Sequence, residues 1–391
     1  MKFQLTDALA ELQVKGLRRA RKTLTSAQGP QVEVDGRRYL AFCSNDYLGL
    51  ANDPRIGEAV CRSVNLYGVG AGASHLISGH GLLHQQLEQA LASFVGCERA
   101  LLFSSGYMAN IGVIPALARR GDAVFSDALN HASIIDGVRL SRADLEIYPH
   151  GGMVHLERAL AQSSAPRKLV VSETVFSMDG DLAPVEQLAR LCARHDASLL
   201  LDDAHGFGVL GAGGRGALSH FGVHGNNIIY LGTLGKAAGG SGAFIAGSDD
   251  VVEWLIQTAR SYIFTTASPP MVAAGLLKSL ELMESEEHRR QHLRALITAL
   301  RDGLQSLPWT TLPSQTAIQP LIVGENQAAM ALMESLQAHG IWVPAIRPPT
   351  VPPGTARLRI SLSAAHSLED VERLAAALHA AARASMAVPH E

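Results

Sequence analysis

The feature of this chain that most limits its fold is a series of short, strongly apolar segments separated by helical patterns. Such short, β-rich segments are typical of buried strands, and six of them occur: Ala100–Phe103, Ala123–Phe125, Leu169–Ser172, Ser198–Leu201, Ile228–Leu231 and Ala243–Ala246. Helical patterns lie between most of them, as at Gly106–Ala118, Ser133–Leu140 and Pro184–His195. This alternation predicts an α/β protein with a mostly parallel sheet covered on both faces.

The two ends of the chain follow other patterns. A basic helical pattern extends to about Thr23, and Asp35-Gly36 separates two strand-like segments, Gln31–Val34 and Arg38–Phe42, as in a hairpin. From Pro269 a long helical stretch leads to the order strand, helix, strand, helix: Ala317–Val323, Ala328–His339, Arg357–Leu362 and Leu368–Ala382. We therefore expect an N-terminal helix and hairpin segment (1–45), a large α/β domain (46–268) and a connecting helix with a small α+β domain (269–391).

Composition narrows the class of protein. The chain has 391 residues, 47% of them hydrophobic, and a net charge of −3, which gives no electrostatic basis for binding nucleic acid or membrane. Its N-terminus lacks the apolar core of a signal peptide, and no apolar run is long enough to span a bilayer. The scattered cysteines have no metal-site spacing, and we read them as reduced core thiols of a cytoplasmic protein: Cys43, Cys61, Cys97 and Cys192.

Polar side chains stand directly after several of the predicted strands. Asp202 and His205 follow one apolar segment, and Glu173 and Ser177 follow another. In parallel α/β sheets, ligands bind at the carboxyl ends of the strands. A metal site at Asp202 and His205 lacks further histidine or cysteine ligands at suitable spacing, whereas a carboxylate there suits a protonated heterocyclic nitrogen.

Two helix starts add candidates. Ser104-Ser105-Gly106-Tyr107 leads from a strand into a helix, whose free N–H groups would bind a phosphate. An ordinary turn with a serine cap explains the same residues. His131 begins another helix, where its ring is either a stacking or acid–base group or an N-cap. Each turn thus keeps two interpretations.

One lysine has surroundings unlike those of the others. Lys236 follows the apolar run Ile228–Leu231 and precedes a glycine-rich stretch. Burial there would lower the pKa of the amine and make it nucleophilic at neutral pH. A loop lysine with a buried stem and a solvated head is the alternative. The remaining lysines have polar neighbours or lie in helical patterns: Lys2, Lys15, Lys22, Lys168 and Lys278.

A phosphate-binding turn, an acid, two histidines and a desolvated lysine thus follow successive strands. Pyridoxal 5′-phosphate needs this set: a lysine for its aldehyde, an acid for its ring nitrogen and a cradle for its phosphate. Thr233, three residues before Lys236, adds a hydroxyl for that phosphate. The joint order of these groups predicts a pyridoxal-phosphate enzyme with no metal.

Four motifs resemble the α-oxoamine synthases in sequence and in order: Ser44-Asn45-Asp46-Tyr47-Leu48-Gly49, Ser177-Met178-Asp179-Gly180, Asp202-Asp203-Ala204-His205-Gly206 and Thr233-Leu234-Gly235-Lys236. The resemblance spans essentially the whole chain. These fold-type I pyridoxal-phosphate transferases join an amino acid to an acyl thioester with loss of carbon dioxide. The resemblance implies a large domain with a mostly parallel seven-stranded sheet, a small α+β C-terminal domain, and a homodimer with its sites at the interface.

The resemblance also implies roles for individual residues. Lys236 would hold the cofactor and move the proton at Cα, Asp202 would pair with the ring nitrogen, and His131 would stack on the ring. His205 would contact the ring hydroxyl, with Ser177 close to it. The implied phosphate-binding residues are Gly106, Tyr107 and Thr233.

The substrate-binding residues implied by the resemblance are Arg21, Asn45, Thr350 and Arg359. Arg359 would bind the amino acid carboxylate, for which a bidentate guanidinium is suited. The basic stretch leaves Arg19 as a second choice for Arg21, and a solvated helix face is the alternative for both. Segments 317–324, 346–352 and 354–359 are similar to the branch of the family that uses L-alanine and a pimeloyl thioester, carried by coenzyme A or acyl carrier protein.

Three other functions remain open. A sibling synthase would use glycine with an acetyl, succinyl or longer thioester. A cofactor-free nucleotide-binding protein would use the Ser104–Tyr107 turn, although the chain has no Gly-x-x-x-x-Gly-Lys loop. A non-catalytic binding protein would keep only the fold. Ser74-His75 stands where smaller or glycine-like residues are expected, which leaves acyl-chain selectivity open.

Overall fold

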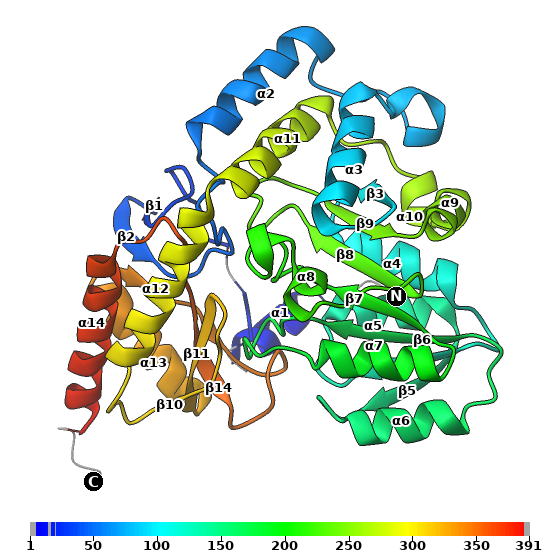
Figure 1. The fold of residues 1–391 in the computed structure, drawn as a ribbon. Helices are drawn as coiled ribbons and strands as arrows, with labels where there is room; N and C mark the ends of the chain where they lie inside the picture. Colours follow the sequence, from blue (N-terminus) through cyan, green and yellow to red (C-terminus); the bar gives the residue numbers. More distant parts are fainter. Residues whose placement is uncertain (1–4, 15–16, 20, 387–391) are drawn as a thin grey trace.

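A seven-stranded sheet forms the centre of the computed structural model, which describes residues 5–14, 17–19 and 21–386 (Figure 1). Its strand order is β3-β9-β8-β7-β6-β4-β5. The bounds are β3 (Arg99–Phe103), β4 (Ala123–Asp127), β5 (Asp144–Tyr148), β6 (Lys168–Glu173), β7 (Ser198–Asp202), β8 (Ile228–Thr233) and β9 (Ala243–Gly247). Within this sheet β9 runs antiparallel to β3 and β8, and the other neighbours pair in parallel. The predicted mostly parallel sheet is confirmed.

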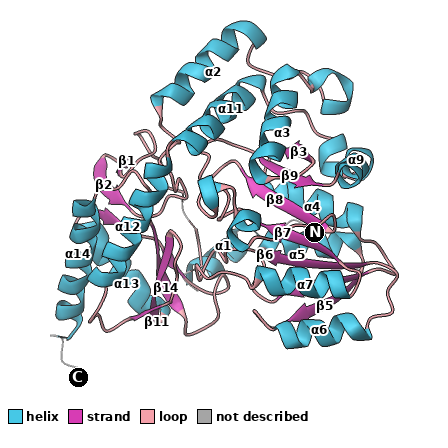
Figure 2. Ribbon diagram, in the orientation of Figure 1, coloured by secondary structure: helices cyan, strands magenta, loops and turns pink. Residues whose placement is uncertain are grey.

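Helices cover both faces of this sheet (Figure 2). Successive side chains of a strand point to opposite faces, and on β7 Leu200 packs in one core while Leu199 and Leu201 pack in the other. The face of Leu200 is covered by α4 (Gly106–Leu117), α5 (Ala132–Ser141), α9 (Asp249–Thr258) and α10 (Arg260–Ile263). The opposite face is covered by α3 (Leu82–Val95), α6 (Met153–Gln162), α7 (Val185–Arg194) and α8 (Ala217–Phe221). Burial on both faces explains why these strands are continuously apolar.

The sequence did not predict β5 as a strand. It lies at the edge of the sheet, and its residues from Asp144 to Ile147 are exposed. An edge strand with an exposed surface needs no continuous apolar run, so Asp-Leu-Glu-Ile-Tyr lacked the pattern that identified the other strands.

The N-terminal region corrects one prediction. The helix α1 (Leu5–Val14) ends well before Thr23, because Leu24 and Thr25 pair with strand β1 and draw the chain into an extended form. The hairpin of β1 (Gln31–Val34) and β2 (Arg37–Ala41) is confirmed. Asp35 and Gly36 have φ angles of 51° and 74°, as a two-residue hairpin turn requires.

After Pro269 the chain forms two helices in place of one long stretch, α11 (Pro270–Ser285) and α12 (Glu287–Gly303). They part at Glu286, whose carboxylate accepts from Arg55 and Arg289. A second sheet follows in the order β10-β11-β14-β13. In chain order, the elements of this C-terminal part are β10 (Thr310–Thr311), β11 (Ile318–Gly324), α13 (Asn326–Ala338), β12 (Ile341–Trp342), β13 (Ala345–Ile346), β14 (Ala356–Ser361) and α14 (Leu368–Met386).

The N-terminal hairpin packs beside the C-terminal elements, because β12 pairs in parallel with β2 (Figure 1). Along the chain, α2 (Pro54–Tyr67) and the π-helix η1 (His75–Gly79) come after β2 and before the first strand of the large sheet. A 3-10 turn, η2 (Ala212–Gly214), follows β7.

In the described residues, no helix combines the length and apolar character needed to cross a membrane. Cys61 on α2 is exposed, so reading it as a core residue was wrong.

Candidate active site

A cavity of about 320 Å³ lies at the carboxyl ends of β6, β7 and β8. Most of the predicted site residues line it together: Asn45, Gly106, Tyr107, His131, Ser177, Asp202, His205, Thr233, Lys236 and Arg359. Ser133, Glu173, Met178 and Ala204 complete the lining. These side chains lie together because the parallel strands end at the same edge of the sheet.

Lys236 places its amine inside this cavity. Its Nζ lies 2.7 Å from Nε2 of His205. Burial lowers the pKa of Lys236 to about 8, although the charge of Asp202 acts in the opposite direction. The amine therefore has a larger neutral, nucleophilic fraction near neutral pH than an ordinary lysine has.

Asp202 ends β7 as a buried carboxylate with two fixed donors. Its Oδ2 accepts from Nδ2 of Asn110 at 2.8 Å, and its Oδ1 accepts from the backbone N–H of Ala204 at 3.1 Å. Asn110 also donates to the hydroxyl of Ser133. Asn110 was missed in the sequence, where a polar residue one turn inside an otherwise apolar helix was the available indication.

The start of α4 has the form of an anion site. Ser105 caps the helix, because its Oγ accepts from the N–H of Met108 at 3.2 Å. Gly106 and Tyr107 occupy the first helical positions, whose N–H groups have no partner inside a helix. Thr233 faces this turn, and a Cβ built on Gly106 would lie 4.0 Å from the Thr233 hydroxyl. The serine-cap interpretation is correct, and it leaves the first N–H groups free.

His131 is the N-cap of α5 and also a wall of the cavity. Its Nδ1 accepts from the backbone N–H of Ser133 at 3.2 Å, so the capping interpretation is confirmed. Burial lowers the pKa of His131, and the Asp202 carboxylate opposes that shift. A neutral, fixed ring thus faces the cavity.

Two predicted substrate contacts lie outside the cavity in this structure. Thr350 is exposed in a turn, where its N–H donates to the carbonyl of Arg347. Arg21 is exposed on the segment after α1, as is its alternative Arg19. Neither Arg21 nor Thr350 lines the cavity.

Arg359, by contrast, reaches the cavity from β14 of the second sheet. Its Nε donates to the carbonyl of Ser177 at 2.5 Å, and its Nη1 donates to Oδ1 of Asn45 at 3.2 Å. The Asn45 amide also accepts from the hydroxyl of Tyr47 at 3.1 Å. The cation is thereby fixed in orientation, which suits it to bind a carboxylate.

Glu173 is a second buried acid that the sequence placed at a strand end but gave no role. It is paired in register with Asp202 on the neighbouring strand, and its Oε1 has no hydrogen-bond partner in the described residues. Burial and the Asp202 charge raise the pKa of Glu173 to about 8. The folded environment therefore favours the protonated form of this carboxyl at pH 7.

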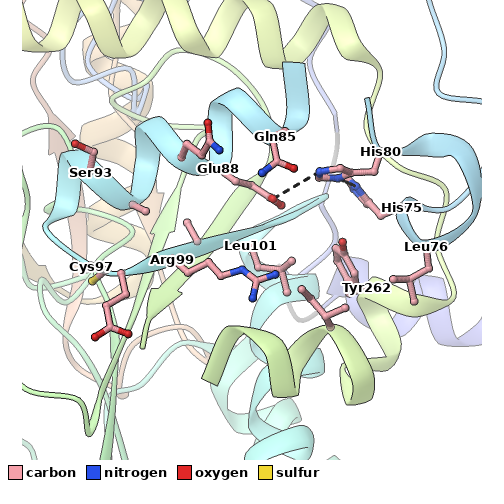
Figure 3. Close-up of a pocket in the computed structure, with 15 residues that line it drawn as sticks. His75, Leu76, His80, Gln85, Glu88, Ser93, Cys97, Arg99, Leu101 and Tyr262 are labelled. Atoms are coloured by element: carbon pink, nitrogen blue, oxygen red, sulfur yellow. Dashed lines mark hydrogen bonds and ion pairs between the residues drawn. The ribbon is translucent and has the colours of Figure 1, made fainter. Parts of the chain in front are cut away.

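A second, larger cavity of about 500 Å³ runs along edge strand β3 (Figure 3). His75 and His80 face each other there, with 2.9 Å between their Nδ1 atoms. Glu88 from α3 lies 3.9 Å from His80 and accepts from the N–H of Leu102 at 3.0 Å. No group of three potential ligands that could hold a metal occurs among the described residues.

Comparison with known proteins places the chain. The model of the family "Aminotransferase class I and II" matches residues 37–378. The 8-amino-7-oxononanoate synthase of Herminiimonas arsenicoxydans is 60% identical over 382 residues, which cover 96% of this chain and 98% of that protein. The chain therefore belongs to the class I and II aminotransferase family, in the group that contains the 8-amino-7-oxononanoate synthases.

Solved structures agree with this placement. An 8-amino-7-oxononanoate synthase from Francisella tularensis superposes with a TM-score of 0.77 at 31% identity, covering 89% of this chain and 99% of that one. Serine palmitoyltransferase from S. paucimobilis, with a bound pyridoxal phosphate–myriocin aldimine, superposes with a TM-score of 0.92 at 30% identity, covering 99% and 98%. The predicted fold-type I architecture is confirmed.

Proposed function

We propose that this chain is a pyridoxal-phosphate-dependent acyltransferase of biotin biosynthesis. It condenses L-alanine with a pimeloyl thioester to 8-amino-7-oxononanoate, releasing carbon dioxide and the carrier thiol. The observation that carries the proposal is the enclosed amine of Lys236, which faces Asp202, His205 and the start of α4 across one cavity. The 60% identity with a named synthase of this reaction supports the substrate assignment.

The residues present fit pyridoxal phosphate. Lys236 offers an amine whose pKa is lowered to about 8, and Asp202 offers a buried carboxylate in the same cavity. The free N–H groups at Gly106 and Tyr107, with the hydroxyl of Thr233, suit a phosphate. When bound, the cofactor supplies an electron sink for negative charge at the Cα of an amino acid.

Side chains of the protein itself have the remaining roles in the reaction. Arg359 binds the alanine carboxylate and fixes the orientation of the Cα–H bond. The Lys236 amine would act as the general base that removes the Cα proton and later returns it. Asp202 would keep the ring nitrogen of the bound cofactor protonated, and His131 would pack against its ring.

A homodimer is part of the proposal. Five large apolar side chains on and beside α2, η1 and α10 are between 49% and 79% exposed: Leu66, Val69, Leu76, Ile77 and Phe264. The η1 and α10 regions are joined by an isolated bridge between Ser74 and Thr266. Large apolar side chains exposed in this way favour a subunit interface. Sedimentation velocity should give a dimer mass, and a monomer would contradict this part.

A cytoplasmic location also belongs to the proposal. The four cysteines are unpaired in the structure, as is usual for proteins of a reducing compartment. Coenzyme A and acyl carrier protein are both retained as carriers of the pimeloyl group.

Product analysis tests the function. The purified protein is supplied with L-alanine or glycine and with pimeloyl, acetyl, succinyl and longer acyl thioesters, and products are identified by mass spectrometry. We expect 8-amino-7-oxononanoate from alanine and pimeloyl thioester. Preferred use of glycine would assign a sibling synthase, and a protein without the visible absorbance of bound cofactor would contradict the proposal altogether.

A further inference from the structure

Tyr47 lies at the centre of a hydrogen-bonded chain that runs from Arg359 to Lys236. Arg359 and the Tyr47 hydroxyl both donate to Oδ1 of Asn45, at 3.2 and 3.1 Å. The Tyr47 oxygen lies 2.6 Å from Nδ1 of His205, and Nε2 of His205 lies 2.7 Å from Nζ of Lys236. Tyr47 is 1% exposed, so solvent does not compete for these contacts.

The donors and acceptors in this chain allow one consistent placement of protons. Because Arg359 donates to Asn45, the amide presents its oxygen, which only accepts. The single Tyr47 proton therefore points to Asn45, and His205 donates its Nδ1–H to the Tyr47 oxygen. A neutral imidazole has one ring proton, so Nε2 of His205 accepts from the amine of Lys236.

The surrounding charges keep this assignment valid at neutral pH. Burial, with Lys236, Arg359 and His131 nearby, lowers the pKa of His205 well below its usual value, so the ring is neutral. Burial raises the pKa of Tyr47, so its hydroxyl stays protonated although Arg359 opposes the shift. The acids close enough to act electrostatically on Lys236 are Asp202, Glu173 and Asp203.

We infer that Tyr47 is a positioning residue of this site: it fixes His205 as the Nδ1–H tautomer and so makes Nε2 the acceptor for the Lys236 amine. An acceptor beside the amine favours the ammonium form, because an ammonium has three protons to donate. Without the Tyr47 hydroxyl, His205 gains access to the Nε2–H tautomer. In that tautomer Nε2, the ring nitrogen beside Lys236, has no lone pair to accept a hydrogen bond from the ammonium. The catalytic meaning of this step rests on the proposed function, whereas the tautomer does not.

The tautomer is measured directly by NMR of the full-length protein, prepared without cofactor and with ¹⁵N-labelled histidine. Long-range ¹H–¹⁵N correlation spectra distinguish Nδ1–H from Nε2–H rings, and a His205→Asn spectrum assigns the signals. We expect Nδ1–H in the unmodified protein and a population of Nε2–H in Tyr47→Phe. An Nε2–H ring in the unmodified protein overturns the inference, even if the variant fails to fold.

The consequence for Lys236 is read by competitive acetylation over a pH series, with the Lys236 peptide quantified by mass spectrometry. Tyr47→Phe should move the pH midpoint of Lys236 labelling down by about half a unit or more. Tyr148→Phe is the matched control, because Tyr148 is equally buried but does not line the cavity. An unchanged midpoint in Tyr47→Phe, or an equal shift in Tyr148→Phe, contradicts the inference.

Turnover adds a reading specific to catalysis. Tyr47→Phe should lower kcat, because the Nε2 acceptor that orients the Lys236 amine is no longer fixed. KM for the amino acid should change little, because Arg359 keeps its contacts with Ser177, Ser361 and Asn45. A change in KM alone would contradict the assigned role. The labelling experiment uses neither substrate nor cofactor, so it still gives an answer if the proposed reaction is not the one catalysed.

Discussion

The cavity along β3 and the cavity at the strand ends contain similar side chains but differ in how the polar groups of those side chains are hydrogen-bonded. The cavity along β3 is the larger, at about 500 Å³ against about 320 Å³, and each cavity is lined by two histidines. Its acid, Glu88, accepts a backbone N–H from Leu102. At the strand ends, Glu173 has an oxygen with no hydrogen-bond partner among the described residues, and a lysine amine lies 2.7 Å from a buried histidine.

This difference shows that cavity size is a poor guide to chemistry in this molecule. Protein interiors normally satisfy their polar groups, as the β3 cavity does for Glu88. A desolvated amine and an unpaired acid oxygen are costly, and such groups are retained where a reaction needs them. The smaller cavity is therefore the site, and the two cavities supply matched variants for testing that conclusion.

The largest expected effect comes from removing the amine that only the strand-end cavity has. Lys236→Ala should lower turnover by at least about 10³-fold, because both the covalent attachment and the general base are lost. It should also remove the visible absorbance of the bound cofactor. Lys278→Ala is the control, since Lys278 only pairs with Glu281 on the surface of α11. Turnover and absorbance that survive in Lys236→Ala would eliminate the assignment of the site.

A smaller effect is expected from the histidines. His205→Asn removes the acceptor beside Lys236 and should lower kcat by about 10- to 100-fold, the equivalent of about 1.4 to 2.7 kcal/mol. His80→Asn changes the β3 cavity in the same way and should leave kcat unaltered. Equal losses in the two variants, measured by steady-state kinetics, would mean that the cavities are not functionally distinct.

How far the sequence predicted this site depends on where each residue stands. Asp202, His205 and Lys236 follow apolar runs, and a parallel sheet brings such positions to one edge whatever the details of packing. Arg359 comes from another sheet, and only the family resemblance indicated it. No pattern along the chain reveals that Tyr47 contacts His205, because that contact joins positions 158 residues apart.

The same reasoning explains the errors in the fold. The helical pattern up to Thr23 has good local propensity, but Leu24 pairs with Val34 and pulls the segment away from a helix. Tertiary pairing overrides propensity in such places. β5 was missed for the opposite reason, since its residues up to Ile147 face solvent and have no apolar run.

The smallest expected effect is a difference between Glu173 and Glu88 in how each acid changes the stability of the protein with pH. The pKa is raised by burial in both folded environments, to about 8 for Glu173 and about 7 for Glu88, from an ordinary value of 4.5. A raised carboxyl pKa means that the folded state holds the proton more tightly. The associated stability is present below pH 4.5 and is lost as the pH rises through the folded-state pKa.

Replacing either acid with glutamine removes this pH-dependent loss. Urea unfolding of the cofactor-free protein should show Glu173→Gln gaining on the unmodified protein up to about pH 8, and Glu88→Gln only up to about pH 7. One pKa unit corresponds to about 1.4 kcal/mol, so at pH 8 the gain of Glu173→Gln should exceed that of Glu88→Gln by about 1 kcal/mol. If the two gains follow the same pH curve, Glu173 is an ordinary buried acid, and the electrostatic contrast between the cavities rests on Lys236 alone.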